Sequence, residues 1–247
     1  MNGTLFVLFS KKAKMKARSL MAAMIMGLFV FISCTNAPES DEAKTSEAKK
    51  VSENKTGEIW KLNPSDSKIE WVATKVSGYH IGAVPLKSGE MYIKNGEVTG
   101  GKFIIDLAHL QVTGPKSVDS ASSQKLSGHL KSADFFDVEK NPEGIFEVTD
   151  VRPYKGDAIK DTIDPRQEEI NKYKVTNPTH TVSGNLTLKG ITKNIEFPAR
   201  ITVSGISAEA IAKFNIDRKE WGIVYPGKPD DLIRDAIHLG ISIKASK

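Results

Sequence analysis

The sequence contains very little cysteine: Cys34 is the only one among 247 residues. The chain can therefore form no internal disulfide bond and no zinc or iron–sulfur site built from cysteines. It also lacks the short motifs of common enzyme classes. Its histidines never occur in HExxH or HxH spacing, and no GxSxG, Walker or GxGxxG pattern is present. We therefore expect no cofactor, no metal site and no enzymatic activity.

Acidic residues are absent from the N-terminal segment, which explains the net positive charge. The chain has 35 Lys and Arg against 30 Asp and Glu, and five of the cations precede residue 34. The remainder is neutral and has no overall field that would attract nucleic acid, so we expect no nucleic-acid partner. The hydrophobic fraction of 39% and charged fraction of 26% are typical of a globular domain.

Long apolar runs are also missing. The longest, residues 20–32, would cover about 20 Å as a helix, against about 30 Å of hydrocarbon in a bilayer. Lys16 and Arg18 precede this run, and Ser33 and Cys34 follow it. The pattern is typical of a secretory signal peptide over residues 1–33, with Met15 as the candidate true start. Its end resembles a bacterial lipobox, which predicts a lipid-modified Cys34 that anchors the chain to a membrane. The alternative is a buried free cysteine beside an uncleaved anchor.

Residues 34–58 have almost no large apolar side chains and are rich in Glu, Lys, Ser and Ala. Such a segment cannot bury enough surface to offset the entropy of ordering it. We predict a lipidated N-terminus followed by a disordered tether, which holds the domain at 59–247 away from a membrane. Deleting this tether should not change the thermal midpoint of the domain.

Strict alternation of apolar and polar residues dominates the sequence after Ile59. It is clearest over 195–203, 206–216 and 237–245, and shorter examples are 69–73, 91–93, 103–107, 146–148 and 186–188. Alternation predicts half-buried strands. About eight such strands, each with one solvent-exposed face, predict an all-β fold: an antiparallel eight-stranded barrel.

Glycines mark expected turns at 95–96, 183–185, 189–190 and 204–205. Leu126 and Leu130 are four residues apart and predict one short surface helix over 122–132. The polar segment 154–172 has no clean periodicity, and we expect an irregular excursion there.

The side chains predicted to face the barrel interior are not all large, because several inward positions on neighbouring strands are alanines. An eight-stranded barrel is just wide enough to be filled by side chains or to hold one slender ligand. The alanines favour a cavity. The six aromatic residues of the same inner face favour a filled barrel that serves as a scaffold. The candidate channel-lining residues are Trp71, Phe103, Ile105, Phe146, Leu186, Phe197, Ala199, Ala208, Ala210, Ala212, Phe214 and Trp221.

Three ordered motifs carry a resemblance to a known family. They are GHLKSADFFDVEKNP at 128–142 with Phe146, VSGNLTLKGITK at 182–193, and FNIDR at 214–218 followed by Trp221 and Gly222. Together they resemble the YceI-like family of polyisoprenoid- or lipid-binding, lipocalin-like proteins. The resemblance implies an eight-stranded barrel with a long apolar channel for a prenyl or fatty-acyl chain, in a periplasmic or envelope setting. Residues 75–82 depart from the family's usual pattern.

We therefore favour non-enzymatic binding of a long-chain isoprenoid or fatty-acyl lipid, for carriage, storage or sequestration in the bacterial cell envelope. The lipobox predicts a periplasm-facing lipoprotein of the outer membrane. The alternative is an envelope-tethered scaffold with a filled barrel. A lipid-modifying enzyme is less favoured, although His129, Asp134 and Asp137 could form an acid/base cluster near Arg218. A simpler interpretation is that these residues stabilise the turn after the helix and that Arg218 pairs with one of the aspartates.

Overall fold

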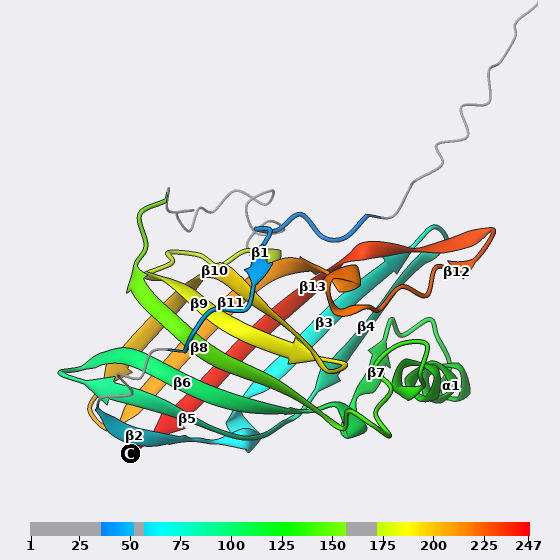
Figure 1. Ribbon diagram of the computed structural model, residues 1–247. Helices are drawn as coiled ribbons and strands as arrows, with labels where there is room; N and C mark the ends of the chain where they lie inside the picture. The colour runs from blue at the N-terminus through cyan, green and yellow to red at the C-terminus, as the bar shows by residue number, and fades with distance from the viewer. Residues whose placement is uncertain (1–35, 52–56, 157–171) are drawn as a thin grey trace, which may run out of the picture. The chain divides into compact units, whose positions relative to one another are not determined.

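The computed structural model describes residues 36–51, 57–156 and 172–247. The expected signal peptide, Cys34 and most of the excursion expected over 154–172 lie outside the described residues. The elements of the described part include the α-helix α1 and thirteen strands (Figure 1). The strands are β1 (Lys44–Glu47), β2 (Glu58–Leu62), β3 (Lys68–Lys75), β4 (Gly78–Val84), β5 (Leu86–Lys94), β6 (Glu97–Asp106), β7 (Gln111–Gly114), β8 (Glu143–Pro153), β9 (His180–Leu188), β10 (Ile191–Ser204), β11 (Ser207–Asp217), β12 (Gly227–Lys228) and β13 (Asp231–Ser246). The helix is α1 (Ser120–Lys131), and the short 3-10 helices are η1 (Pro64–Asp66), η2 (Leu107–His109) and η3 (Arg218–Trp221).

Eight of the strands form a closed antiparallel barrel. In ring order they are β2, β5, β6, β8, β9, β10, β11 and β13, each hydrogen-bonded to the next. The ring closes where Ala245 and Ser246 of β13 pair with Leu62 and Lys61 of β2. This closure confirms the all-β, eight-stranded barrel that the alternating sequence predicts.

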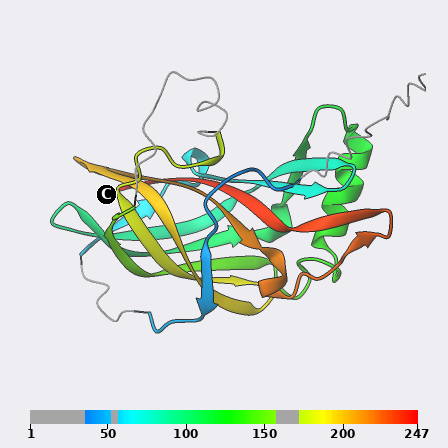
Figure 2. The ribbon, with the colours of Figure 1, turned by 90° about the horizontal axis from the view of Figure 1, so that it is seen from above.

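Strand β13 is 16 residues long and extends beyond the ring. Its earlier part, from Ile233 to Ser242, pairs with β3, and β4 and β7 continue the sheet from there. The helix α1 packs beside β7, where the Val112 N–H donates to Ser127 Oγ at 3.0 Å. Both views place α1 and the hairpin of β12 and β13 at the same end of the barrel (Figures 1 and 2).

The helix and most of the expected turns are confirmed. The Asp119 side chain caps the N-terminus of α1 by accepting a bond from the Ser122 N–H at 2.9 Å. Residues 95–96, 189–190 and 204–205 join consecutive strands, as expected. The turn at 183–185 is wrong, because these residues lie inside β9. Gly184 is needed there for close approach, since a Cβ would collide with the Phe146 ring of β8.

Residues 36–51, called the N-terminal strap below, lie against the barrel wall, so the predicted disordered tether is wrong for them. Within the strap, β1 pairs antiparallel with β10. The Asn215 side-chain amide donates to Pro38 O at 3.1 Å and to Glu42 Oε1 at 2.9 Å. The Asn185 side chain exchanges two bonds with the backbone of Lys49, at 3.0 and 2.6 Å. Hydrogen bonds from barrel residues therefore order a segment that has little apolar surface of its own.

The core lies inside the barrel, where the apolar residues of the alternating strands meet. Alternation directs every second side chain inward, so one contiguous cluster includes residues from all eight ring strands. None of the helices in the described ranges has the length and apolar character needed to cross a membrane.

Candidate functional site

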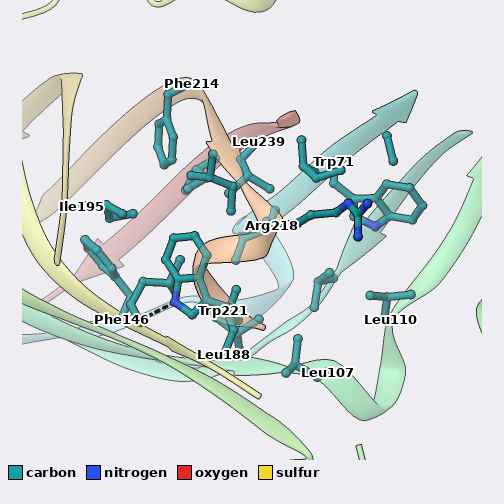
Figure 3. A pocket seen from close by; sticks show the side chains of 18 of the residues that line it. Trp71, Leu107, Leu110, Phe146, Leu188, Ile195, Phe214, Arg218, Trp221 and Leu239 are labelled. Carbon is teal, nitrogen blue, oxygen red and sulfur yellow. Dashed lines mark hydrogen bonds between the residues drawn. The ribbon is translucent and has the colours of Figure 1, made fainter. Parts of the chain in front are cut away.

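The barrel encloses a cavity of about 440 Å³. Its wall is formed by the ring strands other than β2, together with β3, β4, α1 and the segment that follows η3. Side chains from several walls, among them Phe214, Leu239 and Leu188, line the same space (Figure 3). The lining is almost wholly apolar. A volume within the usual range of small-molecule sites and an apolar wall suit a slender hydrocarbon ligand.

Small inward residues lie beside large ones on β10 and β11, and they leave room for the cavity. Phe197 and Phe214 stack across these strands, with ring centroids 4.1 Å apart and planes inclined by 17°. The adjacent inward pair is Ala199 and Ala212, which are register partners. Two methyl groups cannot fill the space that two aromatic rings fill, so the wall leaves open volume beside them.

Several inward-facing side chains of β13 are only half-buried. Ile237, Leu239 and Ile241 line the cavity, yet each of them keeps part of its surface exposed. Apolar side chains that face a packed core would be fully buried. Their remaining exposed surface therefore faces the space inside the barrel.

Eleven of the twelve residues predicted to line the channel lie in the wall of this cavity. They are Trp71, Phe103, Ile105, Phe146, Leu186, Phe197, Ala199, Ala210, Ala212, Phe214 and Trp221. Ala208 is the exception: it is buried but does not line the cavity. It lies at the end of β11, packed between Val203 of β10 and Ala245 of β13 in the register of the sheet.

The aromatic residues do not fill the barrel. Trp221 is fully buried, and its indole N–H donates to Leu186 O at 2.9 Å, the bond drawn in Figure 3. Phe146 and Phe197 lie with ring centroids 5.9 Å apart. These rings pack against one another and against the wall, so the interior stays open.

Polar residues gather at one end of the cavity. They come from β3, β4, α1, η3, the segment before β12, β12 itself and the start of β13: Thr74, Lys75, His80, His129, Arg218, Tyr225, Lys228 and Asp231. Lys228 is exposed, so the cavity reaches the surface here. This is the end at which α1 and the β12–β13 hairpin lie (Figures 1 and 2).

Two of the cations at this end are paired with carboxylates. Lys75 Nζ lies 2.5 Å from Asp231 Oδ2. The bond from Lys75, helped by two bonds from Ser77, lowers the pKa of Asp231 to about 2, so the carboxylate is ionised at neutral pH. The Arg218 guanidinium, which is 4% exposed, donates to Asp235 Oδ1 at 3.0 Å and to two backbone carbonyls.

His80 lies beside the Lys75–Asp231 pair and is half-buried. Burial lowers the pKa of His80, and the positive charge of Lys75 lowers it further. The imidazole is therefore neutral at pH 7, and either ring nitrogen can act as donor or acceptor, depending on the tautomer.

A family model matches most of the domain. The YceI-like domain matches residues 60–245, a range that holds the whole ring from the third residue of β2 to the last residues of β13. The chain belongs to the YceI-like family. The three motifs at 128–142, 182–193 and 214–222 all lie inside the matched range.

Solved structures share the fold of this YceI-like domain. BcnA from Burkholderia cenocepacia is 16% identical, with a TM-score of 0.54, and the match covers 75% of this chain and 99% of that one. A polyisoprenoid-binding domain from Saccharophagus degradans, implicated in plant cell wall breakdown, is 11% identical, with a TM-score of 0.53 and coverage of 76% and 97%. At such low identity the likeness shows the fold alone. No curated protein sequence matches the chain.

The YceI-like domain does not assemble the acid/base cluster considered from the sequence. His129 Nε2 lies 2.9 Å from Asp134 Oδ2, and Asp137 pairs with Lys140 at 2.9 Å. Arg218 pairs with neither aspartate, because its partner is Asp235. The simpler interpretation was therefore right about local pairing after the helix and wrong about the partner of Arg218.

The sequence prediction missed two sets of residues that line the cavity: three aliphatic residues of β13 and most of the polar end. Ile237, Leu239 and Ile241 had a usable signal, since their alternation marks them as inward-facing. Thr74 had no such signal, and His80 had only its place in the segment 75–82, which departs from the family pattern. Isolated polar residues on a strand are normally solvent-facing, so pattern alone assigns them to the wrong side.

Proposed function

We propose that this YceI-like domain binds one long-chain amphiphile, a polyisoprenoid or fatty-acyl lipid, inside the barrel and catalyses no reaction on it. The observation that carries the proposal is the apolar cavity with half-buried aliphatic side chains in its wall. The domain carries, stores or sequesters the lipid.

The energetics of such a site need few polar contacts. Each methylene group that moves from water into an apolar cavity contributes about 0.8 kcal/mol, so ten buried carbons contribute on the order of 8 kcal/mol before ordering costs. The name of the Saccharophagus degradans domain, which describes polyisoprenoid binding, supports this class of ligand. The separation of His129, Asp137 and Arg218 into different ion pairs supports binding over catalysis.

We further propose that the domain works in the bacterial envelope as a periplasm-facing lipoprotein of the outer membrane. The support is the short apolar run after basic residues and the Ser33–Cys34 ending of a lipobox. The strap begins at residue 36, so a lipid on Cys34 would hold the barrel close to the membrane rather than at the end of a long tether.

Extraction of bound lipid tests the binding function. The purified domain is extracted with organic solvent, and the extract is analysed by mass spectrometry. We expect a long-chain lipid in stoichiometric amount and uptake of a fluorescent long-chain lipid by the delipidated protein. A domain that yields no lipid and takes up none has a scaffold function instead.

A further inference from the structure

Three buried side-chain atoms in the described part of the structure have no hydrogen-bond partner: Trp71 Nε1, Thr74 Oγ1 and His80 Nδ1. All three residues line the cavity. Buried polar atoms in folded proteins almost always have a partner, and an unpaired one is costly. Three orphans in the wall of one cavity indicate that a bound molecule supplies the missing partners.

The three residues lie on two neighbouring strands. In the register of β3 and β4, Trp71 is opposite Gly82, and Ala73, which lies between Trp71 and Thr74 in the chain, is opposite His80. The indole of Trp71 occupies the space that a Cβ on Gly82 would need. Trp71 is 7% exposed and Thr74 is 3% exposed. Packing therefore fixes these side chains even though their polar atoms have no partner in the protein.

The chemistry of the three groups limits what they can bind. The Trp71 N–H can only donate, so the ligand must present an acceptor. The Thr74 hydroxyl and the neutral His80 imidazole can donate or accept. Of the cations that line this end, the partly buried Lys75 and the buried Arg218 are already paired with carboxylates, and Lys228 is exposed to solvent. An anionic head group would therefore lack a free buried cation to balance it.

We propose that Trp71, Thr74 and His80 form a subsite for an uncharged, oxygen-bearing head group, a hydroxyl or a carbonyl, of a lipid whose tail occupies the cavity. This subsite rests on the proposed lipid-binding function. It selects by hydrogen bonding, because a head without oxygen leaves the three groups unpaired and a phosphate head brings an unbalanced charge.

Displacement of a fluorescent long-chain lipid by three C20 probes tests the subsite. The probes are geranylgeraniol, geranylgeranyl monophosphate and the corresponding C20 hydrocarbon. In the parent protein we expect the alcohol to bind most tightly. Thr74→Val keeps the shape and removes the hydroxyl, whereas Trp71→Phe removes the indole N–H together with one ring; each should weaken the alcohol about three- to tenfold. In Thr74→Val the affinity for the hydrocarbon should not change.

Stability of the ligand-free variants gives a second readout that a purely structural role would not produce. Removing an unpaired buried hydroxyl without loss of volume should raise the thermal midpoint of Thr74→Val by about 2 to 4 °C. The matched control is Thr149→Val, whose hydroxyl has partners in Ser183 and Asn194. Its midpoint should fall.

Each contrary result has a separate meaning. Tightest binding of the monophosphate, equal affinity for alcohol and hydrocarbon, or unchanged alcohol affinity in both variants overturns the subsite while the lipid-binding function stands. Failure of all three probes and of the fluorescent lipid to bind the parent protein overturns the proposed function and the subsite with it.

Discussion

At the residue scale, small side chains decide that the barrel is open. Ala199, Ala210 and Ala212 line the cavity beside the stacked rings of Phe197 and Phe214. A barrel of eight strands has an interior that a few larger side chains would fill. The open volume is therefore a property of three methyl groups in the wall as much as of the fold.

Replacing Ala210 by Phe tests this volume directly. The new ring should occupy vacant space, so we expect a loss of stability below about 1 kcal/mol, against the 1 to 3 kcal/mol or more typical of overpacking a filled core. Uptake of a fluorescent long-chain lipid should fall at least tenfold, because the ring takes the place of the ligand. Chemical denaturation and lipid uptake are measured on the same preparation.

The control for Ala210→Phe is Thr202→Phe, which adds the same ring to an exposed position of the neighbouring strand β10. It should leave lipid uptake unchanged. Severe destabilisation by Ala210→Phe, together with no lipid uptake by the parent protein, would contradict an open cavity.

At the scale of elements, the strap shows that a polar segment can be part of the folded barrel. β1 adds a strand beside β10, and Asn185, Asn194 and Ser183 form a hydrogen-bonded cluster with Thr149 beneath Lys49. Side-chain amides that bond to backbone groups imitate the ladder of a sheet. The strap is therefore held by hydrogen bonds and contributes to stability without a large apolar face.

Removing the strap should destabilise the domain. We expect a form that begins at residue 57 to have a thermal midpoint about 4 to 10 °C below one that begins at residue 36, since several hydrogen bonds are lost. Asn185→Ala should give part of this effect. Glu47→Ala is the control: its exposed ion pair with Lys193 should contribute little. Equal midpoints of the two forms would show that the strap docks without stabilising the barrel.

At the scale of the whole molecule, the described residues of the barrel enclose an apolar interior with a polar opening, formed by α1, the β3–β4 pair and the β12–β13 hairpin. An amphiphile fits this arrangement with its tail inside and its head at the opening. Attachment to a membrane would place such a carrier beside its source of lipid. The sequence feature that bears on attachment is Cys34.

The expected acylation of Cys34 is tested by fractionation. Several acyl chains on one cysteine give a stable anchor, whereas an unmodified chain has none. Cys34→Ser should therefore move the protein from the membrane fraction to the soluble envelope fraction. Mass spectrometry of the N-terminal peptide checks the modification itself. Unchanged fractionation and no added mass on the parent peptide would exclude the anchor.

The sequence by itself determined most of the ring strands, the barrel that they form and part of the cavity wall. Alternation in β10, β11 and β13 reports which side chains face inward, because the period of a strand is fixed by its backbone. Trp71, Phe146 and Phe214 could therefore be assigned to the interior before their neighbours were known.

Only the tertiary structure decided the contacts between segments that are far apart in the chain. The strap bonds to Asn185 and Asn215, Lys75 meets Asp231, and Ala208 is packed between two neighbouring strands. These contacts depend on register and ring order, which periodicity does not encode. Whether a buried atom such as Trp71 Nε1 has a partner is likewise fixed by the positions of all its neighbours, so the polar end of the cavity emerges only from the folded barrel.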